Sequence, residues 1–370
     1  MAEGKIKVLH VLTDKNVGGA GRWLLNYLRY HDRREFLVKV VLPLESALIP
    51  LLTPLDVELI LCSDMTDSSF DRKAFGALKE IFIDEQPFIV HTHASLTARM
   101  AAKAIHVPVV LNTKHCMESA PGSLAKRIAR REVNHRFSDK TIAVSKAVRK
   151  SMIAGGVSPK RVVTIYNGVE KIHKLNDEQR AELFASLGVA AGRKAVGIVA
   201  RLEEVKDHAM FLQAVYQVVQ EREDIQFYVI GDGSLRYELQ TYAMELGVED
   251  FVTFTGFVDD VEKIEGALDL AVLTSKEEAL CLSLIETMSV GIPAIGTDTG
   301  GVGEVILHGQ NGYLVPVGNA DRLAKRILEL LSDEELYQNM SQTAEAFVAE
   351  HFSAQQMTAR IERLYLEELK

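Results

Sequence analysis

Two glutamates, Glu278 and Glu286, lie eight residues apart in the segment Ser275–Pro293, which reads SKEEALCLSLIETMSVGIP. The apolar run Leu270–Leu273 precedes them, which predicts a strand, a loop carrying Glu278 and a helix carrying Glu286 one to two turns in. Carboxylates accept paired hydrogen bonds from vicinal hydroxyls, so this pair suits a sugar or a ribose, while the free amides at the helix start favour a phosphate. The alternative is that Glu278 caps the helix and Glu286 is merely exposed, the more frequent state of an isolated glutamate.

Two cations follow another apolar run, Ala195–Ala200. Arg201 ends that run, and Lys206 is predicted to begin the next helix. Both side chains would then project from the carboxyl end of a strand, where an Arg fork and a Lys point charge can hold a diphosphate. In the alternative interpretation, Arg201 forms a surface ion pair with Glu203 or Glu204.

Glycines mark three further turns. Gly18 and Gly19 precede a helical stretch, and adjacent glycines let backbone amides approach an anion closely. Their spacing is not the GxGxxG dinucleotide pattern, and no acidic residue ends a clear second strand, so hydride-transfer chemistry is weakly supported. Gly231-Asp-Gly233 and the segment Thr255–Val258, which contains Gly256 and Phe257, end two later apolar runs and could hold a base. Each is, on its own, also typical of a simple turn.

Histidines gather at the ends of two predicted strands, in His91-Thr-His93 and in Thr113-Lys-His115. An H-x-H pair indicates a metal site only when further ligands lie nearby. The chain also holds no D-x-D motif that could bind a divalent cation beside a diphosphate. We therefore expect neither a metal nor another cofactor, and we take His115 as the better candidate for contacting a reacting sugar.

Short apolar runs alternate with helical stretches from end to end. Continuous apolar runs indicate strands covered on both faces, hence mostly parallel sheets, and their alternation with helices indicates a doubly wound α/β fold. The predicted strands are Ile6–Leu12, Leu37–Val41, Val57–Leu61, Phe88–Val90, Val107–Leu111, Thr141–Val144, Val162–Ile165, Ala195–Ala200, Ile225–Ile230, Phe251–Phe254, Leu270–Leu273 and Pro293–Gly296.

The strand pattern restarts after Gly168, so we predict two domains, residues 1–168 and 169–350, which a chain of 370 residues can accommodate. Asp177 is expected to cap a helix that ends at Gly188. Residues 351–370 form an amphipathic helical pattern that needs a partner surface. Two such sheets would face each other across a cleft at their strand carboxyl ends, where open α/β sheets bind ligands.

Composition excludes several classes of protein. Only 9 of the residues are proline and 47% are hydrophobic, which argues against a collagen-like or disordered chain. No apolar run approaches the ~18 residues of a membrane span, and the N-terminus does not resemble a signal peptide. Three widely spaced cysteines suit free thiols in a reducing compartment. These features predict a cytoplasmic protein.

The net charge of −9 conceals a basic window, residues 114–161, where twelve Lys and Arg face three acidic residues. A nucleic-acid-binding protein is not indicated, because the rest of the chain is strongly acidic. Part of the window, Ser123–Phe137, has Leu124 and Ile128 on one side and basic residues elsewhere. Such a helix can lie on an anionic membrane, here its inner face, at about 1 kcal/mol per cation. The alternative is an ordinary helix with a solvated basic face.

Together these residues resemble a glycosyltransferase of the GT-B fold, of the kind grouped as family 4. The resemblance extends over nearly the whole chain and implies two Rossmann-like domains facing across a cleft, a final helix that crosses back to the N-terminal domain, a retaining reaction and no bound metal. Besides the cations and glutamates above, it rests on Gly18-Gly19-Ala20, Val144–Val148, Tyr166–Val169, Thr299-Gly300-Gly301, Glu304 and Asn311-Gly312.

The resemblance also implies residue roles. Arg201 and Lys206 would hold the diphosphate, Glu286 the ribose and Glu278 the donor sugar. His115 would lie beside that sugar, and Gly19 would approach the phosphate from the other domain. Where the family usually has Gly-Phe-Gly after the first glutamate, this chain has Ala279-Leu280-Cys281, which would narrow the donor-sugar site or shift its amides. The predicted catalytic residues are His115, Arg201, Lys206 and Glu278, and the predicted donor-binding residues are Gly18, Gly19, Gly231, Gly233, Phe257, Val258, Cys281, Leu282, Ser283 and Glu286.

The expected function is metal-independent, retaining transfer of a hexose or N-acetylhexosamine from a nucleoside-diphosphate sugar to a glycan, lipid-linked or other hydroxyl acceptor, for a cell-surface polysaccharide or lipopolysaccharide. UDP is expected from its frequency in the family. Arg201, Lys206 and the helix start near Leu282 would stabilise the departing diphosphate. No carboxylate is placed as a nucleophile, so we expect front-face attack. The alternatives are a nucleotide-sugar epimerase of the same fold, with His91, His93 and Glu118 as the only hints of an acid/base pair, and a non-catalytic nucleotide-sugar-binding subunit.

Overall fold

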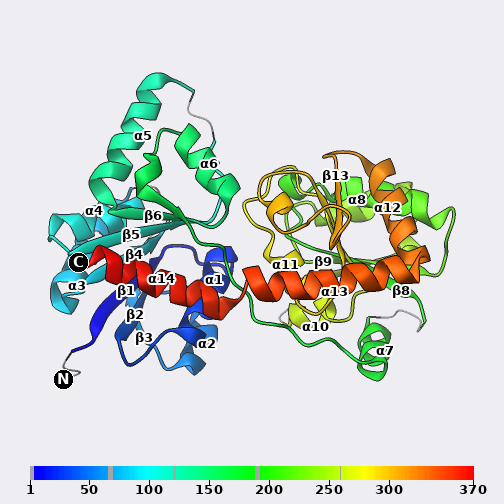
Figure 1. Cartoon of the computed structure of the whole chain (residues 1–370), viewed down its shortest axis with the longest axis horizontal. Coiled ribbons are helices and arrows are strands. Elements are labelled where there is room, and N and C mark those ends of the chain that lie inside the picture. The colour runs from blue at the N-terminus through cyan, green and yellow to red at the C-terminus, as the bar shows by residue number, and fades with distance from the viewer. Residues whose placement is uncertain (1–3, 66–69, 120–121, 188–191, 259) are drawn as a thin grey trace. The chain divides into compact units, whose positions relative to one another are not determined.

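The structure is a computed structural model that describes residues 4–65, 70–119, 122–187, 192–258 and 260–370. The chain divides into two compact units. The first consists of Met1–Gly168 together with Ser353–Lys370, and the second of Val169–Phe352. Each is built on one fully parallel sheet, and Figure 1 shows the elements of both.

The first unit carries seven strands in the order β3-β2-β1-β4-β5-β6-β7, so that the chain reverses its direction of progress between β1 and β4. Such a switch point opens a crevice at the carboxyl ends of the two strands. The strands are β1 Ile6–Leu12, β2 Phe36–Pro43, β3 Glu58–Cys62, β4 Ile89–His93, β5 Val109–Lys114, β6 Lys140–Ala143 and β7 Val162–Thr164.

Helices cover both faces of this sheet. One apolar core lies on the side of α1 and α14, which pack against each other (Figure 1), and buries Met357, Ile361 and Tyr365 of the last helix. A second core lies on the side of α3 and α4 and buries Leu78 and Phe82. The helices of the unit are α1 Gly19–Tyr30, α2 Ile49–Leu52, α3 Arg72–Glu85, α4 Leu96–Ala104, α5 Leu124–Phe137, α6 Lys146–Ala154 and α14 Ala354–Glu368.

The second unit has the strand order β10-β9-β8-β11-β12-β13, with its switch point between β8 and β11. The predicted fold class, two Rossmann-like domains with parallel sheets, is confirmed. The strands of the second unit are β8 Lys194–Val199, β9 Ile225–Ile230, β10 Val252–Gly256, β11 Leu270–Leu273, β12 Ala294–Thr297 and β13 Gly312–Val315. Its helices are α7 Asp177–Ser186, α8 His208–Val219, α9 Arg236–Glu245, α10 Val261–Glu265, α11 Leu282–Met288, α12 Ala320–Ser332 and α13 Glu334–His351.

Some element limits differ from the prediction. The helix α7 is capped by Asn176 rather than Asp177, because the Asn176 side chain accepts from Gln179 N and the Gln179 side chain accepts from Asn176 N. Its expected end, Gly188, lies outside the described residues. The strands β4 and β5 run on through the polar residues that were expected to follow them, and β13 was not predicted.

Candidate functional site

The backbone around Arg201 is held against the Gly231-Asp-Gly233 turn. Leu202 N donates to Asp232 O at 3.0 Å, beyond the end of the β8–β9 ladder. Gly231 has φ +133°, and a Cβ there would lie 2.2 Å from Ala200 O. A Cβ on Gly233 would lie 2.5 Å from Leu202 O. Both glycines are therefore needed for close backbone packing, so this turn positions Arg201 rather than merely reversing the chain.

The guanidinium of Arg201 is exposed and has no hydrogen-bond or ion-pair partner among the residues that the structure describes. The alternative, a direct ion pair with Glu203 or Glu204, is not formed, because both carboxylates contact other groups, although the charge of Arg201 contributes to lowering the pKa of Glu203. Glu203 accepts from Ser234 Oγ at 2.8 Å, and Glu204 lies 3.6 Å from Lys276 Nζ. Arg201 thus presents all its donors to solvent at the carboxyl edge of the second sheet.

Lys206 and Glu278 form a direct ion pair, with Nζ 2.5 Å from Oε2. Ser275 Oγ donates to the same carboxylate oxygen at 3.2 Å. Lys206 does not begin the next helix as predicted: it ends the 3-10 turn Glu204–Lys206, and α8 starts at His208 after the left-handed residue Asp207. This left-handed step lets the chain turn before the helix begins, which leaves Lys206 in the loop beside Glu278.

Backbone contacts hold the two loops together at the switch point between β8 and β11. Thr274 Oγ1 donates to Lys206 O and Lys276 N donates to Val205 O, both at 2.8 Å. From the other side, Gly301 N donates to Glu278 O at 2.9 Å. Sequence reasoning missed these supporting roles, although the adjacent glycines Gly300 and Gly301 after a strand were a signal of close backbone approach.

Glu286 is the fifth residue of α11 and is 6% exposed, so the alternative of a solvated glutamate is wrong. The helix has no side-chain cap, and Cys281 occupies the N-cap position, so Glu278 is not its cap either. Cys281 is buried, and burial raises the pKa of its thiol. Ala279 and Leu280 are buried as well, while Leu282 and Ser283 at the start of the helix remain half-buried.

The turn after β10 meets the same sheet edge. Gly231 N donates to Gly256 O at 3.1 Å, which brings this turn to the Gly231-Asp-Gly233 turn. Phe257 follows directly and is 75% exposed, an unusual state for a large aromatic side chain. Val258 beside it is half-buried. Four segments of the second unit therefore share one edge: the loop with Arg201 and Lys206, and the segments carrying Gly231, Phe257 and Glu278.

His208 was not singled out from the sequence. It is the first residue of α8 and is buried, with neither ring nitrogen bonded within the described residues. Burial, and secondarily the charge of Lys206, lowers the pKa of His208 to about 4. Its position two residues after Lys206 was the available signal.

In the first unit, Gly18 caps α1 without any side-chain hydrogen bond, and Gly19 is the first residue of that helix. Both lie at the switch point between β1 and β4, on the loop that follows β1. A Cβ on Gly18 would lie 3.5 Å from Asp14 Oδ2, an ordinary contact, so packing by itself does not demand glycine there. Close packing does require a glycine at position 21, because a Cβ there would lie 2.7 Å from the Leu48 side chain.

His115 follows β5 and its Nε2 lies 2.9 Å from His93 Nδ1. Its other ring nitrogen, Nδ1, has no partner within the described residues. Burial and the nearby charge of Lys114 lower the pKa of His115 to about 3, so the ring is neutral. In the part of the chain that the structure describes, no group of three or more His, Cys, Asp or Glu is arranged to hold a metal ion. Glu118, a candidate acid or base, is paired with Arg130 at 3.0 Å.

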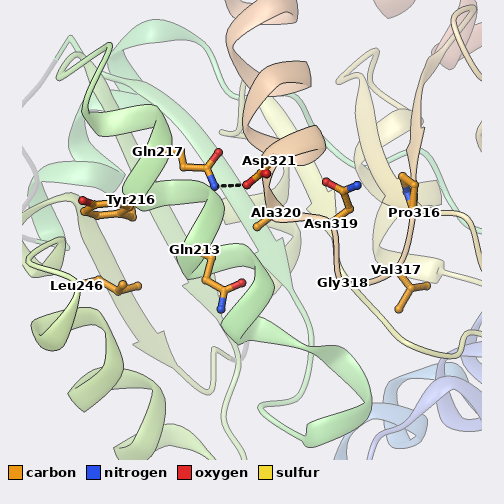
Figure 2. Close-up of a pocket in the computed structure, with 10 residues that line it drawn as sticks. All are labelled: Gln213, Tyr216, Gln217, Leu246, Pro316, Val317, Gly318, Asn319, Ala320 and Asp321. Atoms are coloured by element: carbon orange, nitrogen blue, oxygen red, sulfur yellow. Dashed lines mark hydrogen bonds between the residues drawn. The ribbon is translucent and has the colours of Figure 1, made fainter.

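A cavity of about 530 Å³ lies elsewhere in the second unit, and none of the residues above lines it. Figure 2 shows that it is formed by α8, the end of α9 and the loop between β13 and α12. Gln217 Nε2 donates to Asp321 at 2.7 Å beside it (Figure 2). Sequence reasoning did not identify this cavity.

Two family descriptions match the chain. "Glycosyltransferase Family 4" matches residues 17–171 and "Glycosyl transferases group 1" matches residues 179–347. The first match lies in the first structural unit apart from its last three residues, and the second match lies wholly in the second unit.

Curated relatives carry related descriptions. The chain is 32% identical over 212 residues to N-acetyl-alpha-D-glucosaminyl L-malate synthase of Bacillus anthracis, an alignment covering 57% of this chain and 55% of the relative. It thus spans little more than half of that protein's length. The chain is 24% identical to the UDP-Gal:alpha-D-GlcNAc-diphosphoundecaprenol alpha-1,3-galactosyltransferase of Escherichia coli, covering 98% and 97% of the two chains.

Solved structures agree in fold. Anabaena HepE in complex with UDP and glucose superposes with a TM-score of 0.84 at 23% identity, covering 97% of this chain and 99% of that one. A glycosyltransferase from Rickettsia africae superposes with a TM-score of 0.86 at 20% identity, covering 99% of each. These similarities establish the overall fold.

Proposed function

The chain belongs to family 4 of the GT-B glycosyltransferases, and on that premise we propose that it transfers a hexose or N-acetylhexosamine from a UDP-sugar to a hydroxyl of a glycan or lipid-linked acceptor, with retention and without a metal. The names of the Bacillus anthracis and Escherichia coli relatives, and the UDP bound by HepE, support this class of donor. We propose that this reaction serves the synthesis of a cell-surface polysaccharide or lipopolysaccharide.

The observation that carries the proposal is the arrangement at the β8–β11 switch point, where Arg201 presents unpartnered donors and Lys206 lies against Glu278. An ammonium group has three N–H donors, so Lys206 can keep its bond to Glu278 and still donate to a phosphate oxygen. The Arg201 guanidinium can bind a second phosphate oxygen in its planar fork. Two cations on one sheet edge match a diphosphate.

The remaining residues of this edge are assigned to the other parts of the donor. Exposed Phe257 offers a ring face on which a base can stack. Buried Glu286 is assigned to the ribose hydroxyls, and Glu278 to the sugar, because carboxylates accept from paired hydroxyls. As the glycosidic bond breaks, charge grows on the leaving diphosphate, and Arg201 and Lys206 stabilise it. The departing phosphate oxygen takes the acceptor's proton in a front-face attack.

The test is turnover with a panel of nucleoside-diphosphate sugars, measured by nucleotide release with and without glycan and lipid-linked acceptors. Arg201→Ala is expected to lower kcat/KM by about 100-fold, the typical effect of removing one charge-stabilising donor. Lys325→Ala, an exposed lysine on α12, is the matched control and should retain parental activity. Parental rates in both Arg201→Ala and Lys206→Ala would refute the assignment of the diphosphate site.

The same assay separates the two alternatives. An epimerase would change the sugar nucleotide without an acceptor, and a non-catalytic subunit would bind UDP without turnover. The epimerase has little support from its candidate acid and base, because Glu118 is paired with Arg130 and His91 is fully buried.

A second proposal concerns location: the basic window contacts an anionic membrane on the cytoplasmic side. The described residues of α5 include no buried side chain, and Leu124 and Ile128 are 71% and 53% exposed. The neighbouring helix α6 contributes Lys146, Arg149 and Lys150 to the lining of a groove of about 570 Å³. Apolar side chains within a field of cations suit the interface of an anionic bilayer.

Flotation with vesicles tests this location. Binding to vesicles containing phosphatidylglycerol, but not to purely zwitterionic ones, is expected, with loss in the Leu124→Glu/Ile128→Glu variant. Leu51→Glu, an equally drastic change at an exposed leucine of α2 in the same unit, is the control and should float like the parent. Absence of any dependence on anionic lipid would refute the proposal. No helix in the described part of the chain is long and apolar enough to span a membrane.

A further inference from the structure

Six side chains of the first unit form one continuous hydrogen-bonded row, here called the histidine chain. Taken in order from its half-buried end to its fully buried end, the histidine chain consists of His115, His93, His10, Tyr365, His91 and Thr113. The successive donor–acceptor distances are 2.9, 3.3, 3.3, 2.6 and 2.7 Å. The row is therefore unbroken from its first residue to its last.

The sheet brings these residues together. His10 and His91 are direct partners in the β1–β4 ladder, and His93 is the partner of Thr113 in the β4–β5 ladder. Alternate residues of a strand share a face, so the imidazoles of His91 and His93 stack, with centroids 5.0 Å apart and planes 10° apart. Tyr365 of α14 lies between His10 and His91 in the row and links them.

Every imidazole of the histidine chain is neutral. Burial lowers the pKa of His10, His91 and His93 well below its ordinary value, and neighbouring rings would repel any added charge. The indole of Trp23 covers the row, with its centroid 4.7 Å from that of His93. A neutral imidazole has one N–H donor and one acceptor nitrogen. Each ring must therefore donate on one side and accept on the other.

Such a row has two possible directions, and Thr113 decides between them. Its hydroxyl is fully buried, and among the described residues His91 Nε2 is its only partner. If His91 donated to Thr113, the Thr113 hydroxyl proton would be left without an acceptor, at a cost of roughly 1–3 kcal/mol. The hydroxyl therefore donates to His91 Nε2. His91 Nδ1–H then donates to Tyr365, whose hydroxyl donates to His10 Nε2.

The same order continues to the end of the row. His10 Nδ1–H donates to His93 Nε2, and His93 Nδ1–H donates to His115 Nε2. The proton of His115 is consequently on Nδ1, the one ring nitrogen of the histidine chain with no partner in the described residues. We propose that the histidine chain holds His115 as the neutral tautomer that donates from Nδ1 to an oxygen of a carbohydrate substrate bound at this edge of the first sheet, and that His93, His10, Tyr365 and His91 are positioning residues for that donor.

The inference rests on the proposed function for the identity of the acceptor, because a sugar hydroxyl or ring oxygen is the group that accepts such a bond. It makes a definite chemical statement about His115: the side chain is a hydrogen-bond donor and not a general base. A base would need a free lone pair at Nδ1, which this direction of the row removes.

Nitrogen-15 NMR of the full chain labelled at histidine reads the tautomers directly, because protonated and unprotonated ring nitrogens resonate in different regions. Signals are assigned with the variants His115→Asn, His93→Asn and His10→Asn. We expect the Nδ1–H tautomer for His115, His93, His10 and His91. The Nε2–H tautomer at His115, which free imidazole side chains prefer in water, would overturn the proposal.

Tyr365→Phe cuts the row at a residue three hydrogen bonds from His115. We expect His10, His93 and His115 to change toward the Nε2–H tautomer, and kcat/KM to fall about fivefold to tenfold, the size of one neutral hydrogen bond. Tyr27→Phe is the control: this tyrosine also packs on His10, with centroids 4.9 Å apart, and its hydroxyl interacts with that of Tyr365 but is hydrogen-bonded to no imidazole of the row within the described residues.

Unchanged tautomers in Tyr365→Phe, or an equal effect of Tyr27→Phe, would overturn the proposal. Thermal unfolding of both variants serves to compare their folded states. The NMR measurement needs no substrate. A wild-type protein with the expected tautomers but no sugar transfer would therefore contradict the proposed function and not the direction of the histidine chain.

Discussion

The carbonyl oxygen of Glu278 lies where a side chain on residue 300 would begin: a Cβ built on Gly300 would be 1.8 Å from it. Gly300 also has φ +51°, a left-handed conformation. The neighbouring amide of Gly301 donates to the same carbonyl at 2.9 Å. The turn after β12 thus fixes the position of the loop that carries Glu278. Through the Lys206–Glu278 ion pair it also positions the Lys206 side chain.

We expect Gly300→Ala to displace the Glu278 loop and lower kcat/KM by about tenfold or more, because a shift of about 1 Å can cost far more than the strain itself. Gly318→Ala is the matched control. It has φ +74° but nothing within 4 Å of its Cβ, so it carries backbone strain without a clash. Activity near the parental value in Gly318→Ala, with loss in Gly300→Ala, separates displacement from strain. Equal kinetics in both variants would contradict the positioning role.

The Lys206–Glu278 ion pair should couple strongly. A double-mutant cycle with Lys206→Ala and Glu278→Ala, read by urea unfolding, is expected to give a coupling free energy of about 1–3 kcal/mol, because both groups are largely shielded from water. The exposed pair Lys171–Glu345 has the same 2.5 Å separation and serves as the control cycle. Its coupling should be about 0.5 kcal/mol or less. Equal coupling in the two cycles would contradict shielding as the cause.

Stability should fall as the pH decreases below about 6.5. Burial depresses the pKa of His10, His91 and His93 in the folded chain, and burial with Lys114 brings that of His115 to about 3. The unfolded chain, whose histidines titrate normally, then binds more protons than the folded one. Each such histidine lowers the unfolding free energy by about 1.4 kcal/mol per pH unit below that point.

Urea unfolding between about pH 7 and pH 5 measures this slope. His10→Gln removes one of the depressed groups and should reduce the slope by about one proton. A wild-type slope no steeper than that of His10→Gln would show that burial does not hold these rings neutral.

The three thiols should react at different rates with a disulfide reagent. Cys116 is exposed, whereas Cys62 and Cys281 are buried, and burial raises the pKa of both buried thiols, which lowers their reactive thiolate fraction. One fast and two slow reactions are expected in the native protein. Cys116→Ser should abolish the fast phase, and its persistence in that variant would mean that Cys281 at the N-cap of α11 is accessible.

Local patterns predicted most strands and their parallel arrangement. Continuous apolar runs such as Ile225–Ile230 recur unchanged in the structure, because a strand buried on both faces must be apolar along its length. The strand β13, Gly312–Val315, escaped prediction because a strand of four residues after an Asn-Gly pair has too little pattern to distinguish it from a turn. The cap of α7 was missed by one residue, since neighbouring Asn176 and Asp177 are both good N-caps.

The sequence by itself determined the residue types of the site and their place at strand ends, because strand period and glycine conformation depend on near neighbours. Only the tertiary structure decided which of them meet. Lys206 and Glu278 are 72 residues apart, and His10 and Tyr365 are 355 apart. These pairs form because β8 lies beside β11, because β1 lies beside β4, and because α14 packs on α1. Strand order is a long-range choice, set by the burial of whole faces, and no local spacing records it.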